Sequence, residues 1–277
     1  MNEPLPAGLH IVATPIGNLG DLSPRAADVL RRASRILAED TRVTGKLLAH
    51  IGSEVPMRRY DDHSSDVERA RIVERLAGEA IALVSDAGTP LISDPGYKLV
   101  RAARAAGHAV FTLPGPSAAI AALTLAGLPT DRFLFAGFLP ARAKARAEAI
   151  SEMAAVRATL VFYESGPRLG ESLKALGNGL GEREAAVARE ISKLHEECVT
   201  GSLAELADRY GRVAPKGEIV IVVGPPGEAP PASEAELDAA IEAALGSMTA
   251  SEAAAAVARQ LGVPRKRAYA RVLELIR

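Results

Sequence analysis

The chain has 277 residues, of which 48% are hydrophobic and 24% charged, and 33 basic against 34 acidic residues leave a net charge of −1. This composition excludes intrinsic disorder over most of the chain, because the apolar surface is large enough to offset the entropy lost on folding. The near-zero net charge also excludes a basic surface for nucleic acid over the whole molecule, although it allows local basic patches. The length corresponds to two domains or to one large domain.

Residue content also bounds the cellular setting. The single cysteine, Cys198, excludes a disulfide framework and a cysteine-based zinc site and favours a reducing compartment. The five histidines lack metal-ligand spacing, so we expect no metal. No signal-peptide pattern opens the chain, and the longest apolar runs, 118–126 and 219–223, are far below the roughly 20 residues that span a bilayer. We therefore expect a soluble, cytoplasmic protein without membrane contact.

The first half of the sequence alternates short apolar runs with helical patterns. Residues 9–14 are typical of a buried strand, and Ser23 followed by Pro24 predicts the start of a helix that runs to about Arg32. Further strands are predicted at 35–38, 80–85 and 109–113, and further helices from a capping box at 65–68 to about 78 and from a cap at 94–95 to 107. This alternation predicts a mostly parallel sheet with helices on its faces.

In the second half of the sequence, the predicted strands and helices no longer alternate regularly. Strands are predicted at 133–137, 159–164, 185–190 and 218–223, and helices at 142–154, 167–176 and 203–210. We expect a second α/β domain with a mixed sheet, so that the chain divides into an N-terminal α/β domain at 1–117, a C-terminal α/β domain at 118–227 and a tail at 232–277. The Pro-rich stretch 225–231 predicts a linker before the tail.

The tail predicts a small helical module. A capping box at 249–252 opens one helix, Gly262 ends it, and Pro264 restarts the chain into a final helix. Residues 259–277 hold six basic side chains against Glu274 alone. Two helices joined in this way, with a basic second helix, suggest a helix-turn-helix-like element. A docking tail with a solvated basic face explains the pattern equally well.

Several familiar motifs are missing from the sequence. No Gly-x-Gly-x-x-Gly follows a strand, no phosphate-binding loop ends in Gly-Lys-Ser/Thr, and no Gly-x-Ser-x-Gly is found. What the sequence does contain is three unusual turns at predicted strand ends, at 14–18, 86–90 and 114–117. Each turn alone is a plain connection, but in an open α/β sheet the three converge at the carboxyl edge, where ligands bind. Their hydroxyls, amides and one carboxylate suit a polar small molecule with a cationic end.

At these turns the sequence closely resembles the tetrapyrrole methylase superfamily, the class III S-adenosylmethionine methyltransferases. Within it, the sequence is most similar to the 16S rRNA (cytidine-2′-O)-methyltransferase family. The matching segments are VATPIGNLGDLSPRA, LAEDTRVTGKLL, SDAGTPLISDPG, PGPSA, FYESGPR, EISKLHEE and KGEIVIVVG. The resemblance implies a two-domain α/β fold plus a small C-terminal helical module, a homodimer, and S-adenosylmethionine held between the two α/β domains. It further implies 2′-O-methylation of a cytidine in the decoding region of 16S rRNA within the 30S subunit.

The resemblance also implies which residues hold the cofactor. In this sequence the matching positions lie in three turns and one strand end: Pro15, Asp86, Ala87, Gly88, Thr89, Pro90, Leu91, Ser117, Ala118, Tyr163 and Glu164. Ser117 and Ala118 present a hydroxyl and an amide at a predicted helix N-terminus, which is a natural site for a carboxylate.

The chemistry requires a group that removes the acceptor's hydroxyl proton, and the sequence leaves several candidates open. They are Asp40, His63, Glu164 and Lys193. Lys193 qualifies if desolvation lowers its pKa, but a surface or RNA-phosphate contact explains it as well. A loop histidine that contacts substrate or solvent explains His63 equally well. Asp40 and Arg42 are also interpretable as a local ion pair, and Glu164 as a group that orients ligand hydroxyls.

RNA contacts require cations, and the sequence offers two groups of them. One is Arg132 with Arg142, Lys144 and Arg146, and the other is Arg265, Lys266 and Arg267 in the tail. A charged helix face is the alternative interpretation of the first group. Two other functions stay open for the whole chain: a tetrapyrrole methyltransferase of the same fold, and a non-catalytic rRNA-binding assembly factor.

Overall fold

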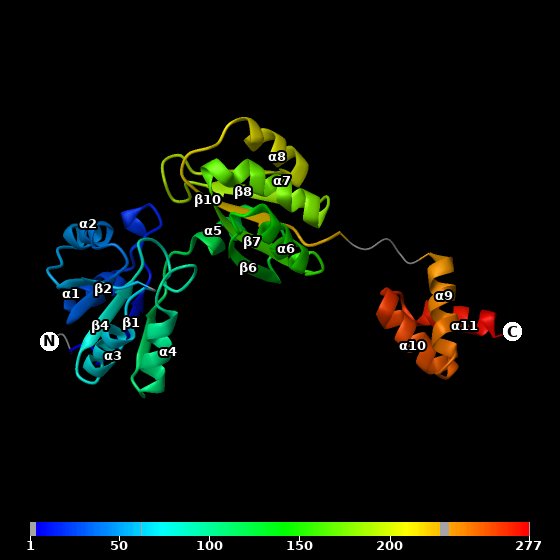
Figure 1. The fold of residues 1–277 in the computed structure, drawn as a ribbon, viewed down its shortest axis with the longest axis horizontal. Coiled ribbons are helices and arrows are strands. Elements are labelled where there is room, and N and C mark those ends of the chain that lie inside the picture. The colour runs from blue at the N-terminus through cyan, green and yellow to red at the C-terminus, as the bar shows by residue number, and fades with distance from the viewer. Residues whose placement is uncertain (1–3, 62, 228–232, 277) are drawn as a thin grey trace. The chain divides into compact units, whose positions relative to one another are not determined.

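The computed structural model describes residues 4–61, 63–227 and 233–276. The chain forms two compact units, Met1–Pro225 and Pro226–Arg277, and each is described by itself. The first unit contains two five-stranded sheets, and helices are the regular elements of the described part of the second (Figure 1). Among the described residues, no helix is long and apolar enough to cross a membrane.

The first sheet is parallel throughout and has the strand order β3-β2-β4-β1-β5. Its strands are β1 (Gly8–Val12), β2 (Arg35–Ala38), β3 (Met57–Arg59), β4 (Ala80–Val84) and β5 (Val110–Leu113). The crossover helices are α1 (Pro24–Arg32), α2 (Thr41–Ile51), α3 (Asp66–Arg75) and α4 (Tyr97–Ala105), with a short 3-10 helix, η1 (Leu19–Asp21).

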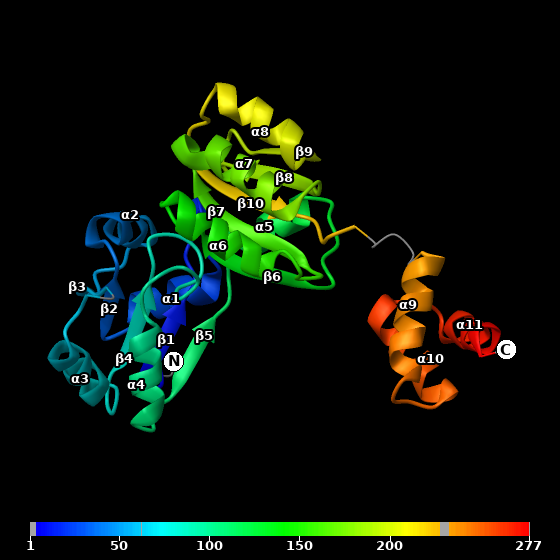
Figure 2. The ribbon, with the colours of Figure 1, turned by 45° about the vertical axis from the view of Figure 1, so that its right-hand side comes forward.

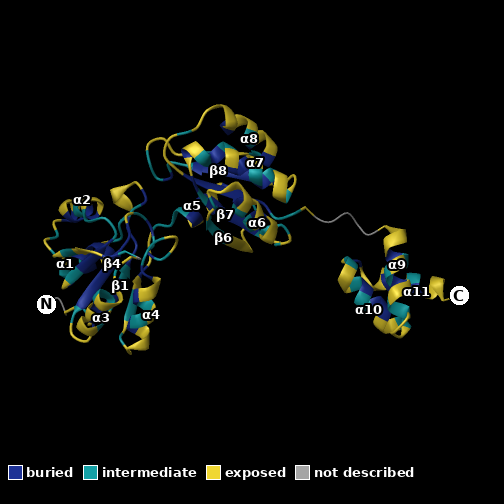
Figure 3. Ribbon diagram, in the orientation of Figure 1, coloured by how far each residue is buried: buried dark blue, intermediate teal, exposed yellow. Residues whose placement is uncertain are grey.

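Alternating side chains on the first sheet build a core on each face. Val12, Ile36 and Val84 pack with α1 and α2, whereas Leu37 and Leu83 pack with α3 and α4. Because successive residues of a strand point to opposite faces, β2 and β4 read as continuously apolar runs that are buried on both sides. Figure 3 shows these strands in the colour of buried residues, with exposed helix surfaces outside them.

The second sheet is mixed and has the order β6-β7-β10-β8-β9. Only β6 and β7 are parallel, and the other neighbours are antiparallel (Figure 2). Its strands are β6 (Phe133–Phe138), β7 (Thr159–Ser165), β8 (Glu184–Arg189), β9 (Glu197–Ser202) and β10 (Glu218–Val223). Its helices are α5 (Ala118–Leu125), α6 (Ala143–Met153), the 3-10 helix η2 (Gly166–Arg168), α7 (Leu169–Leu180) and α8 (Leu203–Arg212). One face packs against α6, α7 and α8, and the other packs against α5.

The second unit is a three-helix module of α9 (Glu234–Leu245), α10 (Ala250–Leu261) and α11 (Arg265–Leu275). It has its own apolar core, which includes Ile241, Val257 and Val272. Gly262 ends α10 in the left-handed conformation with φ 64°, as the sequence predicts. Arg271 joins α11 to α9 through an ion pair with Asp238 at 2.6 Å. The predicted linker at 225–231 lies outside the described residues from 228 onward.

The predicted fold class is confirmed, as are the predicted parallel and mixed sheets. The capping boxes at Ser202 and Thr249 are present, and Ser23 caps α1. The predicted cap at Asp94 is wrong: α4 begins at Tyr97, its N-cap is Gly96 with φ 131°, and it has no side-chain cap. Five elements were not predicted, namely η1, α2, β3, β9 and α9.

Candidate functional site

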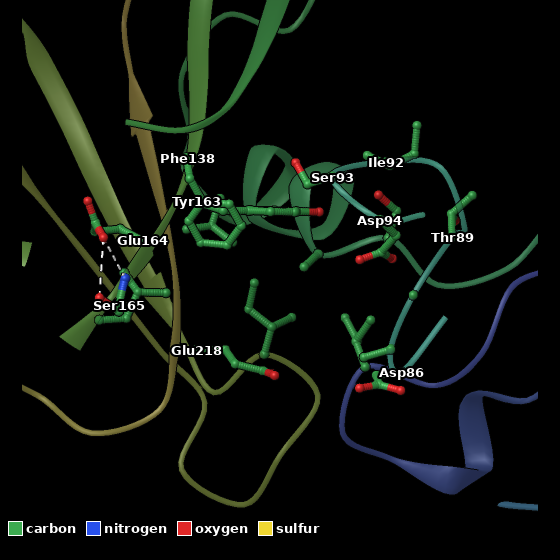
Figure 4. Close-up of a pocket in the computed structure, with 18 of the residues that line it drawn as sticks. Asp86, Thr89, Ile92, Ser93, Asp94, Phe138, Tyr163, Glu164, Ser165 and Glu218 are labelled. Atoms are coloured by element: carbon green, nitrogen blue, oxygen red, sulfur yellow. Dashed lines mark hydrogen bonds between the residues drawn. The ribbon is translucent and has the colours of Figure 1, made fainter. Parts of the chain in front are cut away.

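A cavity of about 380 Å³ lies at the carboxyl end of the first sheet, where the second sheet faces it (Figure 4). Both sheets contribute to its lining. The residues are Ile16, Glu39, Asp86, Ala87, Gly88, Thr89, Ile92, Ser93, Asp94, Ser117, Ala118, Phe138, Tyr163, Glu164, Ser165, Ile191, Gly217, Glu218, Ile219 and Val220.

The three predicted turns are bonded to one another beneath this cavity. The backbones of Thr14 and Gly88 exchange two hydrogen bonds of 2.8 and 3.1 Å, which join the chain after β1 to the chain after β4. The hydroxyl of Thr89 donates to the carbonyl of Pro116 at 2.9 Å, which adds the third turn. Gly88 has φ 80°, and a Cβ there would lie 3.3 Å from the side chain of Ile16. The position therefore favours glycine, and the turns converge as the sequence predicts.

Three carboxyl groups gather at the first-sheet end of the cavity: Glu39, Asp86 and Asp94. Burial raises the pKa of Glu39, and the nearby Asp94 and Asp86 raise it further, while the backbone of Asp86 opposes this shift. Burial also raises the pKa of Asp94, although the hydroxyl of Ser85 lowers it. This end of the cavity therefore suits a cationic group or ligand hydroxyls.

Tyr163 forms the opposite wall, on the second sheet. Its ring packs edge-on against Phe135 and Phe138, with centroid separations of 4.9 and 5.6 Å. Two groups at the start of α5, the backbone of Ala119 and the side chain of Ser117, act to lower the pKa of its hydroxyl. Burial, together with the charges of Asp94 and Glu218, raises the pKa of Tyr163. The phenol therefore keeps its proton at neutral pH, and the wall is aromatic with one hydroxyl.

Eight of the eleven residues expected to hold the cofactor line this cavity: Asp86, Ala87, Gly88, Thr89, Ser117, Ala118, Tyr163 and Glu164. Pro15, Pro90 and Leu91 do not line it. Leu91 packs with the core that lies under α3 and α4. Pro90 is buried and Pro15 is half-buried, so these two prolines shape the turns whose neighbours face the cavity.

Glu164 borders the cavity, but its carboxylate turns away from it. Successive residues of β7 face opposite sides of the sheet, so Tyr163 faces α5 and Glu164 faces the α7 layer. The Glu164 carboxylate accepts hydrogen bonds from the amide of Ser165 at 2.8 Å and from the hydroxyl of Ser172 at 2.5 Å, and Arg168 lies 3.5 Å away. With 1% of its side chain exposed, Glu164 holds β7 to α7 and is not placed to receive a proton from a ligand.

Lys193 lies at the rim of the cavity and not in its lining. Its ammonium group pairs with Glu190 at 3.0 Å and with Glu218 at 3.2 Å, and its stem covers Gly17, where a Cβ would come within 2.5 Å of the lysine side chain. Burial disfavours the charged amine, but the two carboxylates outweigh it and raise the pKa of Lys193. The condition under which Lys193 serves as a base, a lowered pKa, is therefore not met.

The other two candidate bases also lie outside the cavity lining. Asp40 caps α2 and pairs with Arg42 at 2.6 Å, which lowers the pKa of its carboxyl group to about 2. A carboxylate that acidic is a poor proton acceptor, and the ion pair expected from the sequence is present. His63 lies exposed in the loop before α3, where its amide donates to Asp61 at 2.9 Å.

The expected RNA-binding cations differ in exposure. Arg132, Arg142 and Lys144 are exposed, as are Arg265, Lys266 and Arg267 in the second unit. Arg146, in contrast, is 4% exposed and pairs with Glu171 at 2.5 Å, where it joins α6 to α7. Arg146 is therefore a structural residue, because helical spacing turns it toward the sheet while Lys144 faces solvent.

The sequence carried signals for several lining residues that were not singled out. Glu39 stands one residue after β2, in the segment LAEDTR, and Ser93 and Asp94 stand in SDAGTPLISDPG. Glu218 opens β10 in KGEIVIVVG. Ile191 stands in EISKLHEE, whereas Phe138 had no such signal, because only the assembly of both sheets brings it to the cavity.

The lining fits a ligand with a cationic centre, an apolar or aromatic part and an anionic end. Carboxylates occupy one end, the walls are formed by Ile16, Tyr163 and other apolar side chains, and the first turn of α5 supplies Ser117 and Ala118. Within the described ranges, no group of three or more His, Cys, Asp or Glu side chains is arranged to hold a metal ion.

Comparison with known proteins agrees with this geometry. The family model for Tetrapyrrole (Corrin/Porphyrin) Methylases matches residues 8–207, and the model for the RsmI C-terminal HTH domain matches residues 231–276. Ribosomal RNA small subunit methyltransferase I of Erythrobacter litoralis is 56% identical over 273 residues, which cover 99% of this chain and 97% of that protein. The protein of the same name from Mesorhizobium japonicum is 46% identical, with coverages of 99% and 94%.

Solved structures with the same fold are more distant in sequence. The cobalt precorrin-4 methyltransferase CbiF has a TM-score of 0.59 at 16% identity, over 78% of this chain and 94% of that chain. Diphthine synthase has a TM-score of 0.62 at 16% identity, over 78% and 89%. A uroporphyrin-III C-methyltransferase from Thermus thermophilus, complexed with S-adenosyl homocysteine, has a TM-score of 0.55 at 20% identity, over 78% and 97%.

Proposed function

Because the chain belongs to the tetrapyrrole methylase family, and within it to ribosomal RNA small subunit methyltransferase I, we propose that it methylates ribosomal RNA of the small subunit with S-adenosylmethionine as donor. The acceptor is the ribose 2′-oxygen of a cytidine in the decoding region of 16S rRNA, within the 30S particle. The enzyme works as a homodimer in the cytoplasm.

One observation supports this proposal above the others: the turns after β1, β4 and β5 are hydrogen-bonded into a single floor under the cavity. Such a floor at the carboxyl edge of a parallel sheet is where open α/β folds bind their ligands. The carboxylates at one end suit a sulfonium centre and ribose hydroxyls, and the α5 N-terminus suits the carboxylate of the amino-acid portion.

S-adenosylmethionine, when bound, supplies an electrophilic methyl group on a positively charged sulfur. Asp86 and Glu39 favour its positive charge, Ser117 and Ala118 hold its carboxylate, and Tyr163 with Phe138 closes the wall against water. The protein aligns the acceptor oxygen with the methyl group, which converts a bimolecular encounter into a positioned one.

The exposed cations suit the RNA backbone. Arg132, Arg142 and Lys144 are exposed on the first unit, and Arg265, Lys266 and Arg267 are exposed on the second unit. With aromatic residues at 4% and no Trp, the chain has little material for base stacking, so recognition relies on shape and phosphate charge.

The test is methyl transfer from labelled S-adenosylmethionine to 30S particles isolated from cells that lack this gene. We expect label in 16S rRNA at one cytidine, located by mass mapping, and none in a porphyrinoid offered as acceptor. Label in the porphyrinoid alone would support a tetrapyrrole methyltransferase. Binding to 30S particles without transfer under any condition would support a non-catalytic assembly factor.

A further inference from the structure

The segment that follows Thr89 bends through unusual backbone conformations. Leu91 and Ser93 have φ of 75° and 65°, in the left-handed region that side-chain-bearing residues rarely adopt, and Gly96 has φ of 131°. Strain of this kind persists where the surrounding structure holds it, and it concentrates at functional sites. Its result here is that Ile92, Ser93 and Asp94 all line the cavity.

Asp94 has none of the structural duties that an Asp-Pro pair before a helix usually has. It does not cap α4, whose N-cap is Gly96. Its carboxyl group instead lies among groups that influence one another's pKa, namely the hydroxyl of Ser85, Asp86, Glu39 just after β2, and Tyr163 on β7. Figure 4 shows Asp94 and the hydroxyl of Tyr163 facing the same space from opposite walls.

Three other carboxylates of the cavity are bound to partners, and Glu39 is the remaining rival of Asp94. Glu218 pairs with Lys193 at 3.2 Å, Asp86 accepts a hydrogen bond from the amide of Asp40 at 3.0 Å, and Glu164 accepts one from the hydroxyl of Ser172 at 2.5 Å. Tyr163, with its raised pKa, remains a hydrogen-bond donor at neutral pH. Because burial raises the pKa of Asp94, its carboxylate is a stronger base than that of an exposed aspartate.

We propose that Asp94 is the catalytic residue that accepts the proton of the acceptor hydroxyl during methyl transfer, an inference that rests on the proposed function. The hydroxyl oxygen forms a bond to the methyl carbon with one of its lone pairs. The bond between that carbon and sulfur breaks, and its electron pair stays on sulfur, which becomes a neutral thioether. The hydroxyl proton passes to the Asp94 carboxylate and from there to water.

The first test compares single-turnover methylation of 30S particles by wild type, Asp94→Asn and Asp94→Glu across pH. Wild type should lose rate as the pH falls through the pKa of Asp94, because only the carboxylate accepts a proton. We expect Asp94→Asn to methylate more slowly by about a hundredfold or more. Its pH–rate profile should also lack the acidic limb, which is the fall in rate at low pH. Asp94→Glu should recover part of the methylation rate, and its rate should again fall at low pH. An inactive wild type would contradict the proposed function, whereas an active Asp94→Asn with an unchanged limb would overturn only the role of Asp94.

Two measurements without turnover separate proton transfer from ligand binding or misfolding. Calorimetry with S-adenosylhomocysteine should give Asp94→Asn a Kd within about threefold of wild type, and a loss of tenfold or more would make Asp94 a cofactor ligand instead. The titration of Tyr163, followed by nuclear magnetic resonance of labelled tyrosine with Tyr163→Phe for assignment, should shift to lower pH in Asp94→Asn. The reason is that the charge of Asp94 raises the pKa of that phenol. No shift would mean that the carboxylate does not face the cavity.

Two further variants probe the surroundings of Asp94. Ser85→Ala removes the hydroxyl that lowers the pKa of Asp94, so the acidic limb should move to higher pH. Glu39→Gln removes the rival carboxyl group with a raised pKa. If Glu39→Gln abolished the limb while Asp94→Asn kept it, the proton acceptor would be Glu39 and the proposal would be wrong.

Discussion

The main-chain amide of Asp40 donates a 3.0 Å hydrogen bond to the carboxylate of Asp86, and this bond joins the chain beyond β2 to the chain beyond β4. The backbone of Asp86 in turn lowers the pKa of the neighbouring Glu39, so the two strand ends also interact through their carboxyl groups. The bond from Asp40 to Asp86 fixes the acidic end of the cavity before any ligand arrives, which is the preorganisation that catalysis by positioning requires.

The ion pair beside this bond makes stability depend on pH. Arg42 holds the pKa of Asp40 at about 2, below its value of 3.8 in the unfolded chain. A depressed carboxyl pKa contributes stability that is present above about pH 4 and is lost as the pH falls toward 2. The urea midpoint of wild type should therefore exceed that of Asp40→Asn at pH 7, and the difference should shrink between pH 4 and pH 2. A difference that stayed constant over that range would show that the pair does not stabilise the fold.

The N-terminus of α5 offers a direct test of the cofactor's orientation. Ser117→Asp places a negative charge where the proposed ligand carboxylate lies, so calorimetry should show a loss of affinity for S-adenosylmethionine of about tenfold or more, or roughly 1.4 kcal/mol. Ser117→Ala is the matched control. It loses only the hydroxyl that contacts Tyr163 and should weaken binding less. Equal affinities of wild type and Ser117→Asp would contradict this orientation.

Gly166 is a packing test of the second sheet. It opens η2 and is buried, and a Cβ added there would fall on the carbonyl oxygen of Pro215. Because both sides of this contact are backbone, Gly166→Ala should lower the free energy of unfolding by about 1–3 kcal/mol. Gly78 is exposed and has open space around it, so Gly78→Ala should change stability by less than about 0.5 kcal/mol. Urea denaturation measures both, and a neutral Gly166→Ala would show that the loop at Pro215 gives way.

Arg146 and Lys144 lie two residues apart on α6 but should behave in opposite ways. Arg146→Ala leaves Glu171 unpaired and should cost about 1–3 kcal/mol of stability, less than a fully buried pair because Glu171 is 66% exposed. Lys144→Ala should leave stability within about 0.5 kcal/mol, since its ion pair is long and exposed. It should instead reduce the salt dependence of 30S binding. Denaturation curves and binding at several salt concentrations separate the two, and a stable Arg146→Ala with weakened RNA binding would reverse the assignment.

Sequence reasoning predicted the architecture because the informative signals were local. Two-sided apolar runs such as β4 and β10 identify buried strands, and caps such as Ser23 and Ser202 locate helix starts within one residue. Strand β3 was not predicted because it is only three residues long, Met-Arg-Arg, and two of these residues are exposed. Strand β9 was not predicted because its sequence, Glu-Cys-Val-Thr-Gly-Ser, lies at the sheet edge and mixes polar with apolar residues.

The site was predicted only as far as single turns allow. The position of a turn at a strand end is a property of a few neighbouring residues, so Asp86 and Ser117 were found. The direction of a side chain depends on the register of the strand that carries it, and this is why Glu164 turned out to face α7 while its neighbour Tyr163 faces the cavity. The pKa of a side chain depends on partners that are distant in sequence, such as Glu218 for Lys193. Such partners cannot be predicted from a local sequence pattern.

Each sheet of the first unit is assembled from one uninterrupted stretch of chain, and residues 114–117 are the single passage between them. A cut within this passage would leave two fragments that each keep every strand of their own sheet. The cavity would then exist only where the fragments reunite, so ligand occupancy would report their reassembly.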